Sequence, residues 1–371
     1  MSVAKTRVLG LLCLANLIGL LIFGLWPFQS PRNQVRWLAA RNGLKLGYHS
    51  TIRSAQPLKV SDSASISLEL WLQPEEDDVG TIVSFYDSPN RVSFAVRQEG
   101  PDLMLQKQRD EPLKKTPIEK VYFDKLLPEN KPIFLTITSS PGNTTLYVNG
   151  ELVRTLAGFS VAGKDLERTL LVGDSEAQPD GWVGEFRGLA IYSEALTAAR
   201  AKTHFDSWTN SGRPDSVDGP PPAALYLFDE RRGQIVHSTG STRDELLIPA
   251  QYSILDKTLL EMPWNAFRPD WDYWQDVAIN VGGFIPPAFL AAAYFSLVLP
   301  RRAAFWAFLL GGLTSLTIES LQWFLPTRNS DMTDVLTNTL GSWIGVSMFR
   351  WTAARRVLDR FLTLCESLVR T

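Results

Sequence analysis

The strongest constraint in the sequence is an uninterrupted apolar run close to its N-terminus. Residues Val8 to Phe28 read VLGLLCLANLIGLLIFGLWPF, 21 residues without a charge, and Lys5 and Arg7 precede them. A helix of this length rises about 30 Å, which matches the hydrocarbon core of a bilayer. A cleaved signal peptide has a shorter apolar core that ends at small residues, whereas this run ends in Trp26-Pro27-Phe28. The run therefore predicts an uncleaved membrane anchor.

Three further candidate spans lie in the C-terminal third of the chain, at Val277–Leu299, Ala303–Leu325 and about Val335–Thr352. Lys5 and Arg7, then Arg301 and Arg302, and finally Arg350, Arg355 and Arg356 flank the spans, and four alternating crossings place all three clusters on one side. Basic clusters mark the cytoplasmic side of a membrane. We therefore expect a multi-pass cell-membrane protein with both termini in the cytoplasm. Residues 29–275 and the loop at 326–334 would lie outside.

The long polar middle of the chain offers few residues for metal or disulfide chemistry. The two cysteines, Cys13 and Cys365, lie outside it, and the three histidines are far apart in sequence. We therefore expect neither a disulfide framework nor a zinc site of cysteine or histidine. Lys and Arg number 37 against 39 Asp and Glu, a net charge of −2, so binding to nucleic acid through charge alone is not expected.

The pattern changes to a period of two from Ser65 onward. Ile66, Leu68, Leu70 and Leu72 alternate with Ser65, Ser67, Glu69, Trp71 and Gln73, which predicts a half-buried antiparallel strand. Segments 133–137 and 145–148 flank Pro141-Gly142-Asn143, and Asn149-Gly150 then precedes residues 151–153, a strong hairpin signal. Many short strands separated by turns indicate a β-sandwich.

The motifs ISLELWLQP, IFLTITSSPGNTTLYVNGELV and LLVGDSEAQPDGWVGEFRGLAIYSEALTAAR resemble the laminin-G-like, concanavalin A-like family over about residues 60–205. The segment ALYLFD at 224–229 is similar to the opening strand of that family, although here it comes last, so we expect residues 223–250 to complete the sheet in a permuted order. The resemblance implies binding of glycan or protein, often with calcium at one rim. Calcium is the one cofactor that it suggests.

Several residues of this region are candidates for such binding. Asp174, Glu176 and Asp180 could supply oxygen ligands to calcium, although acidic loops are common and solvated turn residues are the more frequent explanation. Tyr86, Trp182 and Tyr192 could stack on sugar rings, or they could pack in the core. The paired carboxylates of related glycosidases, in an E-x-D-x-x-E run, do not occur in the sequence, so we assign no catalytic residue and expect no hydrolysis here.

A second set of polar residues lies in the predicted membrane spans. Ser315, Glu319 and Gln322 share one helical face, and Glu319 lies about 9 Å below the outer end of its span. Because polar groups are costly in a bilayer, they usually face a partner or a cavity. We therefore predict a membrane polar site, which comprises Asp276, Asn280, Ser315, Glu319, Gln322, Arg328, Asp331, Asp334 and Asn338.

These spacings, S-x-x-x-E-x-x-Q-x-F, R-x-x-D-x-x-D and N-x-x-G, resemble the VanZ-like family, which is named for an association with teicoplanin resistance. The resemblance implies a mixed fold: a four-helix α transmembrane unit with an all-β concanavalin A-like sandwich inserted between helices 1 and 2. The expected parts are an N-terminal helix at 1–35, the sandwich at 36–262, a three-helix membrane region at 263–352 and a cytoplasmic tail at 353–371.

Three interpretations of the polar site remain open. Arg328 could pair with Glu319, Asp331 or Asp334 and only fix helix packing. The site could instead hold a polar envelope ligand, or Glu319 could act as a general acid or base with Arg328 beside an anionic group.

For the whole protein, we expect membrane lipid and a cell-wall glycan or envelope protein as partners, with a membrane enzyme acting on a lipid-linked substrate as the alternative. A passive anchor for an adhesion domain would leave the shared polar face without a reason.

Overall fold

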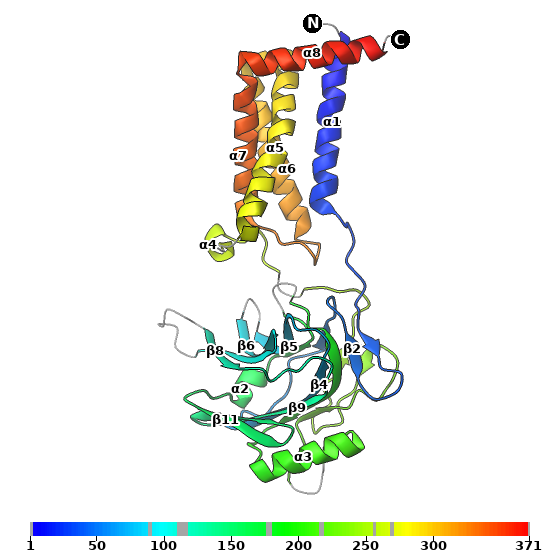
Figure 1. Cartoon of the computed structure of the whole chain (residues 1–371), viewed down its shortest axis with the longest axis vertical. Coiled ribbons are helices and arrows are strands. Elements are labelled where there is room, and N and C mark those ends of the chain that lie inside the picture. The colour runs from blue at the N-terminus through cyan, green and yellow to red at the C-terminus, as the bar shows by residue number, and fades with distance from the viewer. Residues whose placement is uncertain are drawn as a thin grey trace. The chain divides into compact units, whose positions relative to one another are not determined.

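The computed structural model describes residues 3–87, 91–109, 118–175, 180–214, 219–254, 257–267 and 271–369. The chain divides into two compact units, which Figure 1 shows in rainbow colours. One comprises residues Met1–Ser30 and Lys257–Thr371 and consists of helices. The other comprises residues Pro31–Asp256 and contains all the described strands.

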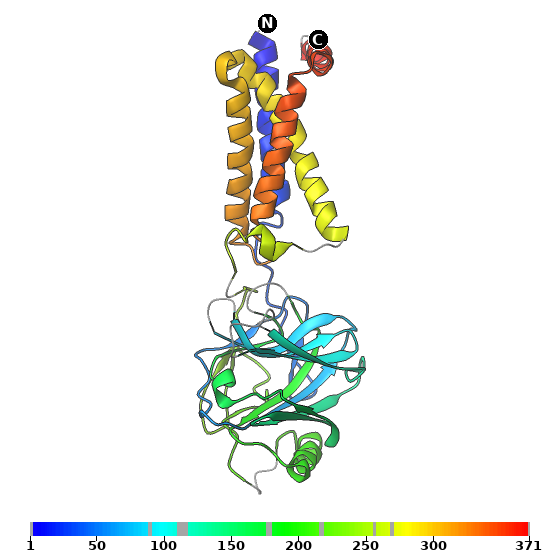
Figure 2. The same cartoon turned by 90° about the vertical axis from the view of Figure 1, so that its left-hand side faces the viewer.

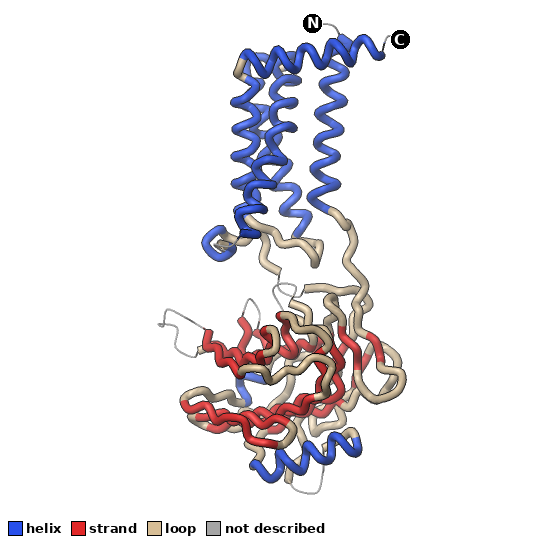
Figure 3. Tube along the Cα trace, in the orientation of Figure 1, coloured by secondary structure: helices blue, strands red, loops and turns tan. Residues whose placement is uncertain are grey.

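The second unit, which we call the sandwich unit, has two antiparallel sheets (Figure 3). One sheet has the order β1-β2-β13-β4-β9-β10-β11, with β14 paired to β13, and the other has the order β15-β16-β3-β12-β5-β6-β7-β8. The strands of the first sheet are β1 (Arg36–Trp37), β2 (Leu44–Leu46), β4 (Ile66–Pro74), β9 (Ile133–Ser140), β10 (Asn143–Val148), β11 (Glu151–Ala157), β13 (Gly184–Tyr192) and β14 (Ala224–Tyr226). Those of the second are β3 (Ile52–Ser54), β5 (Val79–Asp87), β6 (Arg91–Glu99), β7 (Asp102–Gln108), β8 (Ile118–Phe123), β12 (Thr169–Val172), β15 (Ile235–Val236) and β16 (Leu246–Leu247).

The predicted β-sandwich and both predicted hairpins are confirmed. β9 pairs with β10, and β10 pairs with β11 across Asn149 and Gly150, both of which have positive φ angles of 50° and 77°. Asparagine and glycine adopt that conformation more readily than other residues, which explains the turn. The late segment also completes the sheets as expected, because β14 pairs with β13 while β16 pairs with β3.

Strand β4 is buried more completely than its alternating sequence predicts. Its inward residues contribute to the core between the sheets, but Glu69 and Ser67 on the other face are also fully buried. The reason is α3 (Ala198–Ser211), which packs Trp208 on that face beside Trp71 and forms a second, smaller core. Figure 2 shows α3 outside the sheet layer. A short helix, α2 (Gly163–Leu166), completes the unit.

The other unit, which we call the helical unit, contains the apolar helices. Its elements are α1 (Val3–Leu25), α4 (Pro263–Ala266), α5 (Trp271–Val298), η1 (Pro300–Arg302), α6 (Ala303–Gln322), α7 (Met332–Phe349) and α8 (Thr352–Val369). Among the described residues, three segments are long and apolar enough to cross a membrane: Thr6–Leu25, Tyr273–Val298 and Pro300–Gln322. The fourth expected span forms a helix, α7, that does not meet the same limits, so the four-helix transmembrane unit stays a prediction.

Helices α5 and α7 approach each other closely at two glycines of α7. A Cβ atom on Gly341 would lie 2.2 Å from the Val281 carbonyl oxygen, and one on Gly345 would lie 2.3 Å from that of Ile285. The four-residue spacing of these glycines forms a small-xxx-small contact, which lets the two backbones approach closely. It brings the polar ends of α5 and α7 together.

One end of the helical unit collects the basic clusters. Leu9 of α1, Ala293 of α5 and Leu362 of α8 form a buried cluster there, and α8 crosses the ends of the other helices (Figure 1). Arg301 and Arg302 lie in η1 at the turn between α5 and α6, and Arg355 of α8 donates to the Phe349 carbonyl at 2.7 Å. Positive charge is thus concentrated at the end of the bundle where α1 begins.

Candidate functional site

The opposite end of the helical unit contains the predicted polar site, with Glu319 at its centre. Glu319 is only 2% exposed, and its Oε2 accepts the backbone N–H of Asp331 at 2.8 Å. Asp331 in turn caps the start of α7, because its Oδ1 accepts the Thr333 N–H at 2.7 Å. The carboxylate on α6 therefore holds the turn that leads into α7.

A second contact lies one helical turn deeper. Asn338 of α7 donates from Nδ2 to Ser315 Oγ of α6 at 3.0 Å, and both residues are buried. Within the described part of the chain, Asn338 Oδ1 and Gln322 Oε1 are buried acceptors without a hydrogen-bond partner. Unsatisfied buried acceptors cost about 1–3 kcal/mol each, so this cluster has unused capacity for hydrogen-bond donors.

Helix α5 contributes Asp276 and Asn280 to this end of the unit. Asn280 is in hydrogen-bonding contact with Asp334 of α7, and the carboxylates of Asp276 and Asp331 lie near enough to act on Asp334 electrostatically. The structure thus brings residues of α5, α6 and α7 to one end of the unit, as the sequence predicts. Asp331 precedes α7 in an extended conformation, so it shares that end as a capping residue and not as part of a helical face.

Arg328 does not make the contacts expected of it. Its Nη2 and Nε donate to the Trp26 carbonyl at 3.0 and 3.2 Å, and no ion pair joins it to a carboxylate among the described residues. Gln322 Nε2 likewise donates to the Gly24 carbonyl at 2.8 Å. The last carbonyls of a helix have no partner within it, so both side chains serve to cap α1. The first of the three interpretations, in which Arg328 pairs with Glu319, Asp331 or Asp334, therefore does not hold for the described residues.

Lys257 lies near enough for its charge to act on Glu319, and no motif in the sequence indicates it. Its Nζ donates to the carbonyls of Gln322 and Leu325 at 2.5 and 2.7 Å, and so caps the end of α6. Burial lowers the pKa of Lys257 to about 8, against the opposing effect of the Glu319 charge. No sequence spacing could reveal this residue, because it lies more than sixty positions from α6's end and outside every apolar run.

Of the calcium candidates in the sandwich unit, Asp174 and Asp180 are described, whereas Glu176 lies outside the described residues. Asp180 forms an ion pair with Arg97 and accepts from Thr81 Oγ1 at 2.6 Å. Asp174 is fully buried, and its Oδ1 accepts the N–H groups of Ser175 and Asp180 at 2.8 and 2.9 Å. Burial raises the pKa of Asp174 to about 7. Among the described residues no group of three potential ligands gathers, so the calcium site stays a prediction.

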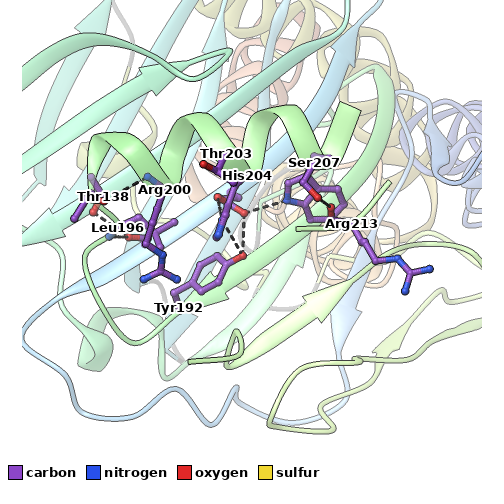
Figure 4. Close-up of polar contacts among 12 residues, drawn as sticks. Thr138, Tyr192, Leu196, Arg200, Thr203, His204, Ser207 and Arg213 are labelled. Atoms are coloured by element: carbon purple, nitrogen blue, oxygen red, sulfur yellow. Dashed lines mark hydrogen bonds and ion pairs between the residues drawn. The ribbon is translucent and has the colours of Figure 1, made fainter. Parts of the chain in front are cut away.

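The aromatic candidates belong mostly to the core. Trp182 is 1% exposed and Tyr192 2% exposed, so neither ring is available to a sugar, whereas Tyr86 is half-buried. Tyr192 lies in a polar cluster under α3, which Figure 4 shows. There Glu69 Oε2 accepts from the Tyr192 hydroxyl and the Trp208 indole at 3.0 Å each, and Oε1 lies 2.8 Å from His204 Nδ1.

The cluster of Glu69, Tyr192, His204 and Trp208 has the residue types of an acid–base site. All four side chains are buried, however, with at most 3% of each exposed. A substrate cannot reach a sealed carboxylate, so this cluster fastens α3 to β4 and β13. Burial raises the pKa of Tyr192, so that its hydroxyl stays protonated and continues to donate.

Two family models match the chain, in different regions. Residues 46–202 match the concanavalin A-like lectin/glucanases superfamily, and residues 224–353 match VanZ/LLP1. The second match begins within the sandwich unit, at β14, and extends through α7. A search of the curated proteins found no match.

Solved structures resemble the chain only at a low level. The native heptameric SAP-like pentraxin from Limulus polyphemus is 17% identical, with 60% of this chain and 95% of that chain covered and a TM-score of 0.36. The receptor binding domain of botulinum neurotoxin D is 15% identical, with 60% and 74% covered and a TM-score of 0.39. The two family matches are the firmer result: the chain joins a concanavalin A-like region to a VanZ/LLP1 region, the combination that its motifs indicate.

Proposed function

We propose that the chain is a cell-envelope membrane protein whose sandwich unit binds glycan or protein on the exterior side. The observation that supports this most directly is that one chain carries a match to the concanavalin A-like lectin/glucanases superfamily and three helices apolar enough to cross a membrane. The collection of basic residues at the α8 end of the bundle supports cytoplasmic termini, because positive clusters favour that side. The ends of α5, α6 and α7 with the polar site then face outward.

Glycan binding is testable with the full-length protein in lipid nanodiscs. We expect the protein to bind members of a broad panel of cell-wall polysaccharides and oligosaccharides, in a direct binding assay with empty nanodiscs as the control. Absence of binding across the panel would remove the glycan part of the proposal and leave an envelope protein as the partner.

A second candidate is an enzyme that acts on a lipid-linked envelope substrate at Glu319. The observation that favours it is the buried carboxylate in a cluster with two acceptors, Gln322 Oε1 and Asn338 Oδ1, that have no hydrogen-bond partner among the described residues. A purely structural network would satisfy both acceptors. Glu319 would act as a general acid or base, and Lys257 would balance its charge. In this hypothesis the substrate reaches Glu319 from the lipid bilayer that surrounds the helices.

Either role could change the access of glycopeptide antibiotics to the cell surface. We expect cells that express the protein to differ in teicoplanin susceptibility from cells with an empty vector. Glu319→Gln keeps the size of the side chain and removes its charge, so the enzyme hypothesis predicts loss of the effect. Full retention of the effect by this variant, at equal expression, would exclude the enzyme and leave the binding function.

A further inference from the structure

The sandwich unit carries an open groove of about 480 Å³, and its lining contains none of the candidate calcium or sugar-stacking residues. Its lining comes from residues 32–37, 233–234 and 248–251. These segments adjoin β1 and β15, which are the terminal strands of the two sheets, so the groove lies where the edges of the sheets meet. Its volume falls in the range of about 300–1,000 Å³ that is typical of small-molecule sites.

One asparagine joins two of the three lining segments, 32–37 and 248–251. Asn33 Nδ2 donates to the carbonyls of Thr51 and Pro249 at 2.7 and 2.9 Å, and its Oδ1 accepts the N–H groups of Val35 and Thr51. Its backbone N–H also donates to the Ala250 carbonyl. Because these two segments are already joined, a ligand would lose little affinity to ordering this part of the site.

Other lining side chains are left free to bind. Arg32, Gln234 and Gln251 are exposed, and within the described part of the chain their side chains make no hydrogen bond or ion pair. Trp37 is half-buried, and its indole Nε1 donates to the Gly233 carbonyl at 3.0 Å, which fixes the ring in the wall. The groove therefore presents a fixed aromatic ring beside two amides and one guanidinium.

From this arrangement we propose that the groove binds an oligosaccharide that carries a carboxylate, and this rests on the glycan-binding function proposed above. The apolar face of a pyranose ring packs on an aromatic ring such as Trp37. The amides of Gln234 and Gln251 can donate to and accept from neighbouring hydroxyls. Arg32 is the one ionisable side chain among the described residues that line the groove, and a guanidinium binds a carboxylate through two parallel hydrogen bonds.

The test uses the full-length protein in nanodiscs and a panel of carboxylated oligosaccharides built from uronic or sialic acid units, each beside its carboxyl-reduced form. We expect the best carboxylated ligand to bind at least about tenfold more tightly than its reduced form. Arg32→Gln should abolish that difference, and Trp37→Ala should weaken both forms about tenfold. Arg243→Gln, at an exposed arginine outside the groove, is the matched control and should bind as the wild type does.

The possible results distinguish sugar binding in the groove from sugar binding elsewhere on the protein. If Arg32→Gln, Gln251→Ala and Trp37→Ala all leave sugar binding unchanged, the groove is not the binding site, and the glycan-binding function stands. Equal binding of carboxylated and reduced forms would overturn the ligand class. Absence of all binding would overturn both proposals. Arg32 and Gln251 make no side-chain hydrogen bond within the described chain, so their variants should fold normally, which a thermal unfolding midpoint within about 2 °C of the wild type would verify.

Discussion

Replacing Glu69 by Leu should destabilise the sandwich unit without touching any exposed surface. Glu69 is fully buried and accepts hydrogen bonds from Tyr192, His204 and Trp208 at 2.8–3.0 Å. Hydrogen bonds to a charged group contribute about 1.5–3 kcal/mol each, which sums to about 5–9 kcal/mol. An apolar side chain offsets part of this loss, because it removes the cost of burying a carboxylate.

The neighbouring contacts reduce the loss further. The Tyr192 hydroxyl lies 3.3 Å from His204 Nδ1, so these two groups can pair with each other once the carboxylate is gone, and only the Trp208 N–H remains unpaired. We therefore expect a net loss of about 2–5 kcal/mol. For a unit of this size that lowers the unfolding midpoint by about 4–20 °C. Glu69→Gln keeps one acceptor oxygen and should cost about 1 kcal/mol.

The assay is thermal unfolding of the purified full-length protein, followed by tryptophan fluorescence, because Trp208 is buried against the cluster. Glu69→Gln serves as the matched control, and its sugar binding should equal that of the wild type. A Glu69→Leu variant as stable as the wild type would refute the structural role of the cluster. A Glu69→Gln variant that folds normally but loses ligand binding would refute the conclusion that the cluster is sealed from function.

Three further predictions follow from buried groups. Because burial raises the pKa of Asp174 from 3.8 to about 7, the folded state loses about 4 kcal/mol of stability as the pH rises from about 4 through 7 and this carboxyl group ionises. Asp174→Asn should therefore raise the unfolding midpoint at pH 8 and barely change it at pH 4. A lower midpoint than that of the wild type at pH 8 would contradict this. Gly341→Val should separate α5 from α7, because its Cβ would meet the Val281 carbonyl, whereas Gly282→Ala meets nothing within 4 Å and should be neutral; equal detergent stability of the two variants would count against the packing. Lys257→Met removes the cap of α6 and should lower the stability of the helical unit by about 1–3 kcal/mol, which chemical denaturation of the variant would measure.

The local parts of the fold were predictable because their signals lie within a few residues. Asn149-Gly150 specifies a hairpin through its own backbone preferences, and the spacing of Gly341 and Gly345 specifies a close helix contact. The burial of Glu69 was not predictable, because it depends on a helix that lies more than a hundred residues later in the chain. An alternating sequence predicts a strand with one buried face, and it does not show whether another element covers the second face.

The candidate site likewise has a part that the sequence predicts and a part that it does not. Helical spacing correctly placed Ser315 and Glu319 together on α6, and Asn338 meets Ser315 as expected of facing polar residues. The partners of the two cations were not predictable, because Arg328 and Lys257 bind backbone carbonyls at helix ends, which every sequence offers equally. The carboxylates are recognisable in the sequence from their residue type, whereas the helix-end carbonyls that accept from these two cations are visible only in the structure.

The central claim is that the polar end of the helical unit faces the exterior while the α8 end faces the cytoplasm. It is tested most directly by single-cysteine labelling in intact cells, in a background where Cys13 and Cys365 are replaced by serine. Asn329→Cys and Arg301→Cys introduce thiols at exposed positions at opposite ends of the helical unit. A membrane-impermeant maleimide should label the Asn329→Cys variant in intact cells and the Arg301→Cys variant only after permeabilisation. Labelling of Arg301→Cys in intact cells with Asn329→Cys protected would contradict the account.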